Sequence, residues 1–552
     1  MALQILRIYK LLIFFVLFGS LLIIRLFYLQ VIENDNLVTQ SLIMRIQEVP
    51  IEVARGEIVD RNGLPLTNTA QHYKIAVFPG QILNAAMAAE QLSELTGISE
   101  PNLFSQITEN HRPFKIKSKI DAAMGEKINK ALIPGVVVVA EKVRYGYLPL
   151  AAHIKGYINL ADNQGVSGIE GMYDDMLRGN QPEYAVALVD AGQQIIPGLG
   201  YKRLRLSSHS DPSNVVLTLD KQIQKAVENI VDKHGIKGAV VVLRPTTGEI
   251  LAMASRPNFN ANHLEEYLNQ SSAPLLNRAI SPYQPGSVFK LVTAAAALEQ
   301  ESIQPEDVFF DPGYIEVDHL RFNGWDYDKG GRGQITFKEA LAYSSNPVFI
   351  EVGLKIGAES LISYAQKFGF GHKTSVDFND EAEGYLPPSD NLYSGELANL
   401  AIGQGKLEAT PLQIASLVAT IANDGIKVVP YVVSKLTNAD GVVIKAYDTP
   451  PGIRVISPRT AAQIQDMMMA VTRYGTGQAA YVEGIGSAGK TGSAETGRKN
   501  ADGQSINHAW FAGYAPVQNP QYAVVIFVEE GMSGSDIAAP MFYEIIKEIT
   551  KS

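Results

Sequence analysis

One long apolar run stands near the start of the chain, within residues 1–32. Residues 11–29, LLIFFVLFGSLLIIRLFYL, are apolar except for Gly19, Ser20 and Arg25. At about 1.5 Å per residue this run spans about 28 Å as a helix, close to the thickness of a membrane's hydrocarbon layer. Arg25 lies near the end of the run, where its long side chain can reach the headgroups. The pattern predicts one membrane-spanning helix.

The charges that flank the run predict its orientation. Arg7 and Lys10 precede it, and Glu33 follows it. Because positive charges stay on the cytoplasmic side, we predict a short cytoplasmic N-terminus at 1–10, a transmembrane anchor at 11–32 and a remainder outside the cell membrane. A cleaved signal peptide is the alternative, but the run is long for one and no small-residue cleavage site follows.

Strand-like and helix-like patterns alternate over residues 36–205, which we predict to form one mixed α/β module without evident chemistry. An Asn-Gly pair marks a turn between two apolar runs. The predicted pieces are strands around this turn (54–79), helices (83–132), a strand (135–148) and a glycine-rich stretch that ends in a helix (151–179).

A second module is predicted at 206–552, after the polar linker RLSSHSDPSN. Apolar runs around Pro-Thr-Thr-Gly in 238–255 predict a hairpin, and two further strands and a helix are predicted close to the end of the chain. These elements are two strands (508–516 and 521–531), a closing helix (537–550) and a mostly helical middle (287–470). Strands at both ends with helices between them predict an α+β domain, in which the two halves of an antiparallel sheet come together around a helical insert.

Composition narrows the possible chemistry. The 552-residue chain has 46% hydrophobic and 19% charged residues, a net charge of −10 and no cysteine. The acidic balance gives no reason to expect nucleic-acid binding. Thiol catalysis, cysteine-ligated zinc and disulfides are excluded.

Ser287 and Lys290 form an S-x-x-K motif at the start of an apolar, alanine-rich segment. Residues three apart share one face of a helix, so the hydroxyl and the amine can meet. Serine at a helix N-terminus also faces free N–H groups that stabilise negative charge. A capping serine beside a solvated lysine is the plainer interpretation, but Phe289 and Leu291 flank Lys290 and make a solvated lysine hard to place.

Two further motifs follow along the chain. Ser344-Ser345-Asn346 fits the pattern S-x-N, which on its own is more typical of an ordinary helix cap or turn. Lys490-Thr491-Gly492 fits K-T-G and lies among small residues, which are typical of an edge strand. A serine hydroxyl needs a nearby base to become a nucleophile. A lysine can be that base only if burial or a second cation lowers its pKa.

Nucleotide and metal chemistry are poorer interpretations. Residues 484–491 match the phosphate-loop pattern G-x-x-x-x-G-K-[ST], but they lack a buried strand before them and a helix after them. The nine histidines are scattered and none forms H-E-x-x-H. We therefore expect neither a bound nucleotide, nor a metal, nor any other cofactor.

Together, S-x-x-K, S-x-N and K-T-G are the motif set of penicillin-binding proteins and class A β-lactamases. Further segments make the chain resemble the monofunctional class B penicillin-binding proteins, which are bacterial peptidoglycan transpeptidases. These segments are RGEIVDRNG (55–63), SGIEG (167–171), YQPGSVFK (283–290), IGQG with TPLQIA (402–415) and GKTGSAE (489–495). The resemblance covers three parts of the chain: the anchor, a non-catalytic pedestal or dimerisation-type domain at 36–205, and a transpeptidase domain at 206–552. It implies that the transpeptidase domain has a fold like that of serine β-lactamases.

The resemblance implies a serine D,D-transpeptidase that cross-links stem peptides ending in D-Ala-D-Ala and is acylated by β-lactams. It implies Ser287 as nucleophile, Lys290 as its base and Lys490 as the second cation. The other implied roles are proton relay by Ser344, substrate-amide binding by Asn346, carboxylate binding by Lys490 and Thr491, an open strand at Gly492, and an oxyanion hole from the backbone N–H groups of Ser287 and Ser493.

Three alternatives keep the same motifs. A β-lactamase needs an acid that activates water, and no E-x-x-L-N element is present, although GELAN (395–399) comes near. A β-lactam sensor and a catalytically weak scaffold are the others. The resemblance further implies a glycan polymerase of the SEDS type as partner, in elongation, division or sporulation.

Overall fold

The computed structural model describes residues 2–34, 37, 46–118, 120–146, 149–159, 162–190, 195–196, 200–205, 212–374, 378–500, 503 and 505–551. The chain forms two compact units. The first consists of Met1–Ala54, Ala70–Val143 and Gly179–Asp211, and the second of Arg55–Thr69, Arg144–Arg178 and Pro212–Ser552. These units are discontinuous along the chain and so differ from the continuous modules predicted at 36–205 and 206–552.

The apolar N-terminal run forms a helix, as predicted. Helix α1 (Ala2–Phe27) continues into the π-helical turn η1 (Tyr28–Ile32). Arg7–Ile32 is long and apolar enough to cross a membrane, and none of its most apolar window is buried. The helix begins well before the predicted anchor at 11–32, because residues 2–10 have no helix breaker.

The first unit contains two small sheets, one of them covered by helices. One sheet has the order β4-β3-β5, and the other has the order β1-β8-β9. Asn84 and Asp121 cap the first turns of α3 and α5 by accepting N–H bonds from Met87 and Met124. The elements are β1 (Ile46–Arg55), β3 (Ala70–Val77), η2 (Pro79–Gln81), α3 (Ala85–Thr96), α4 (Glu100–Glu109), β4 (Phe114–Lys115), α5 (Ala122–Lys130), β5 (Val136–Val143), β8 (Arg178–Leu188) and β9 (Tyr201–Arg205). The helices predicted over 83–132 are confirmed apart from the short strand β4, and the strand predicted at 135–148 is β5, which ends at Val143.

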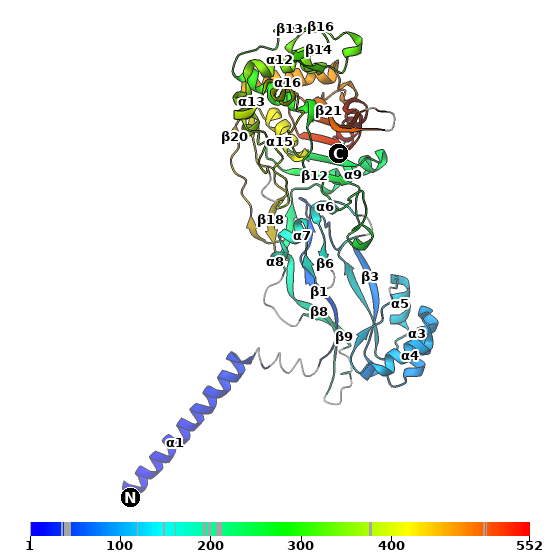
Figure 1. The fold of residues 1–552 in the computed structure, drawn as a ribbon. Coiled ribbons are helices and arrows are strands. Elements are labelled where there is room, and N and C mark those ends of the chain that lie inside the picture. The colour runs from blue at the N-terminus through cyan, green and yellow to red at the C-terminus, as the bar shows by residue number, and fades with distance from the viewer. Residues whose placement is uncertain are drawn as a thin grey trace. The chain divides into compact units, whose positions relative to one another are not determined.

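The second unit is built on a five-stranded antiparallel sheet with the order β12-β11-β23-β22-β21. Figure 1 labels its two edge strands, β12 and β21. The predicted hairpin therefore pairs with strands from the other end of the domain, as expected. The strands are β11 (Gly238–Leu243), β12 (Ile250–Arg256), β21 (Ala488–Lys499), β22 (Ser505–Ala515) and β23 (Tyr522–Val528).

Both faces of this sheet are buried. Val240 and Val524 pack in one core with α9 (Lys221–His234) and α17 (Ala539–Ile549), while Val241 and Val525 pack in the larger core on the opposite face. Because successive strand residues point to opposite faces, a continuously apolar strand such as GAVVVL requires helices on both sides.

The helical insert lies on the face of the larger core. Its helices are α10 (Lys290–Glu299), α11 (Phe337–Ala342), α12 (Asn346–Ile356), α13 (Ala358–Phe368), α14 (Ser394–Ala401), α15 (Pro411–Ala422) and α16 (Pro458–Arg473), with short 3-10 turns η5 (Tyr327–Lys329), η6 (Ser389–Asn391) and η7 (Gln478–Ala480). Thr336 and Thr410 begin α11 and α15 with complete capping boxes.

The region predicted as mostly helical also contains short strands that the sequence analysis missed. The hairpin β14-β15 and strand β13, which pairs with β16, contact α12, and β13 and β14 lie beside it in Figure 1. The strands are β13 (Val308–Asp311), β14 (Tyr314–Val317), β15 (Leu320–Asn323), β16 (Gly333–Thr336), β17 (Ile426–Lys427), β18 (Val433–Thr437), β19 (Val443–Ala446) and β20 (Ile453–Arg454). Strands of two to five residues are too short to show an alternating pattern.

Two early segments belong to the second unit because they pair with it. Strand β2 (Ile58–Val59) joins β10 (Asn214–Leu217) in parallel, in the sheet β19-β18-β10-β2. The remaining elements of these segments and of the unit are α6 (Ala152–Lys155), β6 (Ile158–Asn159), β7 (Gln164–Gly165), α7 (Gly168–Met172), α8 (Asp174–Leu177), η3 (Leu264–Glu266), η4 (Gly286–Phe289) and the π-helical turn η8 (Gly534–Ala538).

A buried ion cluster holds these segments together and explains the RGEIVDRNG and SGIEG stretches. Glu170 is fully buried, and its carboxylate accepts from Arg55 Nε at 2.7 Å and Arg144 Nε at 2.6 Å. Burial alone raises the pKa of Glu170, but Arg144 and Arg55 outweigh it and hold the pKa below its usual value. Loss of Glu170 would leave the buried Arg144 without its carboxylate partner, which costs about 3–5 kcal/mol.

Candidate active site

Ser287 lies in the 3-10 turn η4, and Lys290 is the first residue of the α-helix α10. The sequence analysis placed Ser287 on the first turn of an α-helix, whereas the structure gives a tighter turn that runs into one. The spacing of three residues still places the two side chains one turn apart, because residues i and i+3 eclipse in a 3-10 turn. Lys290 is fully buried and Ser287 is half-buried.

Ser344 occupies the short connection between α11 and α12. Its backbone has a φ of 61°, which a residue with a side chain rarely adopts. Such strain costs about 1–3 kcal/mol and persists only where the surroundings hold it. Two backbone bonds do so here: Ser344 N donates to Leu341 O at 3.2 Å, and Ser345 N donates to Ala340 O at 2.9 Å. The capping role expected of a serine falls to Ser345, whose hydroxyl accepts from Val348 N at 3.3 Å.

The amine of Lys290 binds the S-x-N segment. Its Nζ donates to Ser344 O at 2.7 Å, to Asn346 Oδ1 at 2.7 Å and to Ser344 Oγ at 3.3 Å. Ser287 Oγ makes no hydrogen bond to Lys290 Nζ in the part of the chain that the structure describes. Catalytic hydrogen bonds often shorten only when substrate is bound.

Lys490 reaches the same hydroxyl from the edge of the sheet. Strand β21 is the edge strand, as predicted, and its Lys490 Nζ donates to Ser344 Oγ at 2.8 Å and to Thr491 O at 2.8 Å. The hydroxyl of Ser344 therefore lies between two buried amines. The three motifs, which are far apart in the sequence, converge at this one point.

The pKa values of the two lysines follow from their burial. Desolvation lowers the pKa of Lys490 to about 7, and desolvation together with Lys490 lowers the pKa of Lys290 well below its ordinary value. Two buried carboxylates, Asp311 and Asp326, oppose the shift at Lys290 without reversing it. A neutral amine, which can accept a proton near neutral pH, is thus favoured at Lys290.

Glycines let the turn of Ser287 pack against its neighbours. Gly286 has a φ of +56°, and a Cβ there would lie 2.7 Å from Ser493 O. Gly286 N donates to Gly403 O at 2.9 Å, which places the IGQG segment against the same turn. A Cβ at Gly492 would meet Val288 Cγ2 at 2.9 Å. The structure therefore gives Gly492 a packing reason, whereas the sequence analysis expected a strand kept open for a ligand.

We expect Gly286→Ala to weaken both folding and acylation. Its Cβ adds a clash with the Ser493 carbonyl to the strain of the left-handed backbone, and overpacking of this kind costs about 1–3 kcal/mol. Gly235→Ala is the matched control, because Gly235 has a similar φ of +59° but open space around it. Denaturant unfolding and the rate of penicillin labelling measure the two effects. Equal losses in the two variants would contradict the close approach of Ser493.

Ser493, the expected oxyanion-hole partner, is an exposed residue of β21. Its carbonyl faces the turn of Ser287 and accepts from Gln404 Nε2 at 3.3 Å. Thr491 lies two residues earlier and is almost fully buried. All the predicted site residues thus come from the 3-10 turn η4, the connection before α12 and the edge strand β21, with Lys290 and Asn346 opening α10 and α12.

Sequence reasoning missed several residues that support the site. Thr476 links the end of α11 to the K-T-G strand, since its N–H donates to Ala342 O at 2.9 Å and its hydroxyl bonds to that of Thr491 at 2.6 Å. Trp325 Nε1 donates to Tyr343 O at 2.9 Å, beside Ser344. The Gly-Thr-Gly around Thr476 is a turn signal, but nothing in its spacing indicates contact with the other motifs.

The phosphate-loop interpretation is excluded by the secondary structure. Gly489, Lys490 and Thr491 all lie within β21, where each is paired with a residue of β22. A phosphate loop needs a helix N-terminus directly after its lysine. The strand offers none.

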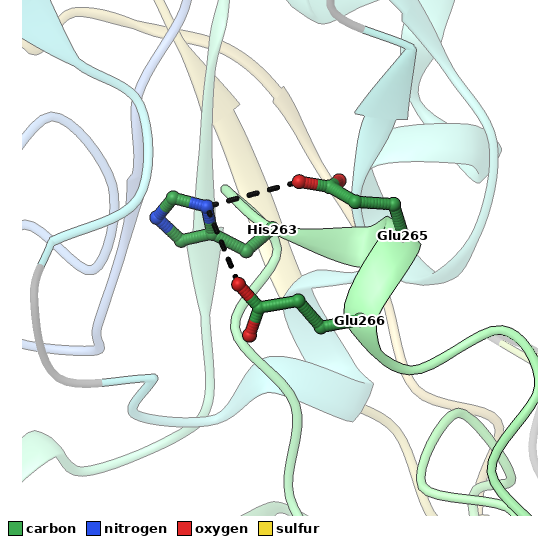
Figure 2. Close-up of side chains that lie close together, drawn as sticks. All are labelled: His263, Glu265 and Glu266. Carbon is green, nitrogen blue, oxygen red and sulfur yellow. Dashed lines mark ion pairs between the residues drawn. The ribbon is translucent and has the colours of Figure 1, made fainter.

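One exposed group of possible metal ligands stands apart from these motifs. His263, Glu265 and Glu266 lie at the 3-10 turn η3, with the carboxylates 3.9 and 4.0 Å from His263 Nδ1 (Figure 2). The exposed side-chain fractions of 54%, 76% and 64% make these weak surface pairs. These three side chains give no reason to assign a metal ion to the site formed by Ser287, Lys290 and Lys490.

Comparison with known proteins agrees with this arrangement. Residues 238–547 match the penicillin-binding protein transpeptidase domain, and residues 50–198 match the penicillin-binding protein dimerisation domain. Stage V sporulation protein D of Bacillus subtilis is 32% identical over 98% of this chain and 85% of its own length. The peptidoglycan D,D-transpeptidase MrdA of Acinetobacter baumannii is 29% identical over 93% of this chain and 84% of its own length.

A solved structure shows the same fold. Penicillin-binding protein 3 of Mycobacterium tuberculosis, complexed with ampicillin, has a TM-score of 0.65 and 28% identity, and the match covers 92% of this chain and 96% of that one. The predicted α+β architecture is thereby confirmed. Both domains match, one relative is 32% identical over 98% of this chain, and the structure brings the three motifs together. This chain therefore belongs to the class B penicillin-binding proteins.

Proposed function

We propose that this protein is a serine D,D-transpeptidase that cross-links peptidoglycan stem peptides ending in D-Ala-D-Ala. The observation that carries the proposal is the convergence of Lys290 and Lys490 on the hydroxyl of Ser344, with Lys290 one turn from Ser287. The relatives named peptidoglycan D,D-transpeptidase support the choice of substrate. The ampicillin complex of the structural neighbour supports covalent inhibition by β-lactams.

In the acylation step, Ser287 Oγ attacks the carbonyl carbon of the penultimate D-Ala while its proton passes to the neutral amine of Lys290. The peptide bond to the terminal D-Ala then breaks. The nitrogen of that D-Ala receives a proton through Ser344, whose hydroxyl bonds to both lysine amines. An ester joins Ser287 to the shortened stem, and D-Ala leaves.

In the second step, the amine of a neighbouring stem attacks the ester. Ser344 and Lys290 take a proton from the attacking amine, Ser287 regains its own, and a new peptide bond forms. The bond exchanged supplies the energy, so no nucleotide is required. Backbone N–H groups of Ser287 and Ser493 hold the oxyanion in both steps, where preorganised donors are most effective.

Substrate binding uses the remaining polar groups. Lys490 and Thr491 hold the terminal carboxylate, and Thr476 fixes the orientation of the Thr491 hydroxyl through the 2.6 Å bond. Asn346 binds the substrate amide. Its side chain is kept in place for this role because its Oδ1 accepts from Lys290 Nζ and its Nδ2 donates to Asn323 O. A carboxylate beside Lys490 favours the ammonium form of this lysine, which leaves Lys290 neutral as the base.

The apolar helix at the N-terminus and the MrdA relatives indicate a membrane-anchored protein. We propose a cytoplasmic N-terminus and a transpeptidase domain outside the membrane, because Arg7 and Lys10 precede the apolar helix and positive charges stay on the cytoplasmic side. That location matches a polymer substrate outside the membrane.

The deciding experiment supplies the purified full chain with a donor pentapeptide stem and a separate acceptor stem. We expect release of D-Ala together with a cross-linked product, both measured by mass spectrometry. D-Ala release with hydrolysis alone would contradict transpeptidation. Penicillin labelling without D-Ala release would favour the sensor or scaffold alternatives.

A further inference from the structure

Residues 323–332, which end β15 and lead to β16, contact the connection that carries S-x-N. Asn346 Nδ2 donates to Asn323 O at 3.1 Å, and Trp325 Nε1 donates to Tyr343 O at 2.9 Å. These two bonds lie on either side of the motif's first serine in the sequence. The proposed reaction gives the tryptophan no role, although its N–H bonds to the residue directly before that serine.

Burial does not explain the position of Trp325. The residue is 55% exposed, so removal of its apolar surface from water contributes little to holding it there. The guanidinium of Arg332 instead lies 5.2 Å from the centre of the Trp325 ring and 4.5 Å from the centre of the Tyr343 ring. Arg332 is held in turn by the buried Asp326, whose Oδ2 accepts from its Nε at 2.7 Å. Charge therefore fixes the indole beside Tyr343.

The peptide bond between Tyr343 and Ser344 is held at both of its polar groups. Ser344 N donates to Leu341 O at 3.2 Å, and Tyr343 O accepts from Trp325 Nε1. The orientation of this peptide plane helps to set the φ of Ser344, which is 61° and strained. Without the bond from the indole, the plane can turn toward an unstrained backbone, and the side chain of Ser344 turns with it.

A small rotation is enough to disturb the contacts of the Ser344 hydroxyl. Lys490 Nζ donates to Ser344 Oγ at 2.8 Å, but Lys290 Nζ lies 3.3 Å from the same oxygen. The second distance is near the upper limit for a hydrogen bond, so little movement would break it. In the proposed function, on which this inference rests, Ser344 needs both contacts to pass a proton to the leaving nitrogen.

We propose that Trp325 is a positioning residue for Ser344, whose hydroxyl relays protons in the proposed transpeptidase reaction. Its indole N–H holds the Tyr343–Ser344 peptide, which keeps the hydroxyl between the two buried amines. Trp325 takes no part in bond making or bond breaking. Its loss therefore slows the step in which Ser344 delivers a proton to the leaving group, and it spares a reaction whose leaving group needs no proton.

The test compares two donors that differ only in the leaving group. One is a pentapeptide stem ending in D-Ala-D-Ala, and the other is the matching thioester, in which sulfur replaces the nitrogen of the terminal residue. A leaving amine must gain a proton, whereas a thiol, with a pKa of about 8.5, can leave as the thiolate. In both cases Ser287 Oγ forms the ester and its own proton passes to Lys290. Release of D-Ala or of the thiol by the full chain gives kcat/KM for each donor.

We expect Trp325→Phe to lower the ratio of the amide rate to the thioester rate about tenfold, because small misplacements of a catalytic group reduce the rate steeply. Phenylalanine keeps a ring beside Arg332 but has no N–H. An intact thioester rate shows that the variant is folded. Tyr543→Phe is the control and should keep the wild-type ratio. It removes the hydroxyl that accepts from Lys547 Nζ at 3.2 Å, on α17 and on the opposite face of the sheet.

Ser344→Ala shows whether Trp325 acts through Ser344. In that background the effect of Trp325→Phe on the ratio should disappear, because the group that it positions is gone. An unchanged ratio in the single variant, an equal loss for both donors, or a loss that persists without the Ser344 hydroxyl would overturn the inference.

Penicillin labelling of the wild-type protein separates this inference from the proposed function. A wild-type sample that neither labels nor releases D-Ala or the thiol contradicts the proposed function itself. A wild-type sample that labels and releases both leaving groups, while Trp325→Phe keeps its ratio, contradicts only the role of Trp325.

Discussion

Ser287→Ala is expected to abolish covalent labelling by a fluorescent penicillin, with no band above background under conditions that saturate the wild-type protein. The reason is chemical: the acyl bond forms on Ser287 Oγ, and the variant has no atom that can replace it. The fold should persist, because the half-buried hydroxyl makes no hydrogen bond to Lys290 that the substitution would remove. Labelling after denaturing electrophoresis measures the effect directly.

Ser302→Ala is the matched control for that experiment. Ser302 lies just beyond α10, and its hydroxyl donates only to Ala297 O, at 3.0 Å. We expect this variant to label as the wild-type protein does. Equal labelling of wild type and Ser287→Ala would show that another residue is the nucleophile, and the catalytic scheme would have to be abandoned.

The sheet and its helical cover could be predicted from the sequence, because both rest on long periodic patterns. Continuously apolar strands such as GAVVVL require cover on both faces, and the structure supplies it with α9 and α17 on one side. The edge position of Lys490-Thr491-Gly492 was predicted from its small neighbours and is confirmed. The α+β class followed from these elements alone.

The composition of the two compact units could not be predicted in the same way. Strand β2 has two residues, and its parallel pairing with β10 depends on a partner more than 150 residues later, beyond the reach of any local pattern. The buried Glu170 between Arg55 and Arg144 is likewise a contact between distant segments. Residues 206–211 of the predicted linker RLSSHSDPSN (205–214) lie outside the described residues.

The identity of the site residues came from motifs, but their geometry did not. Nothing in the sequence indicates that Ser344 takes a left-handed backbone or that Ser345, rather than Ser344, caps α12. Thr476 was missed because its role depends on a contact with Thr491 that only the fold creates. The polymerase partner implied by the resemblance stays a prediction.

Lys290→Met should reduce the rate of penicillin acylation on the order of 10³-fold, the usual contribution of a general base. Methionine keeps much of the volume of lysine in the fully buried site but removes the amine that would accept the proton of Ser287. Lys355→Met is the control, because Lys355 is an exposed residue that donates only to Ser302 O. Stopped-flow acylation measures both variants, and a Lys290→Met rate within tenfold of wild type would rule out Lys290 as the base.

Unfolding measurements on the same variant separate a lost base from a lost fold. The substitution leaves Ser344 O and Asn346 Oδ1 without their bonds from Nζ, but it also removes the cost of burying an amine, so we expect only a small change in the unfolding midpoint at pH 7. The pKa of Lys290 is far lower in the folded protein than in the unfolded chain. Between these two pKa values the unfolded chain therefore binds more protons than the folded protein. The free energy of unfolding of the wild-type protein rises with pH over that range. Over the pH range between the folded and the unfolded pKa, Lys290→Met should lose up to about 1.4 kcal/mol of that rise per pH unit. An unaltered slope would mean that Lys290 is charged in the folded protein, and a charged lysine cannot take the proton of Ser287.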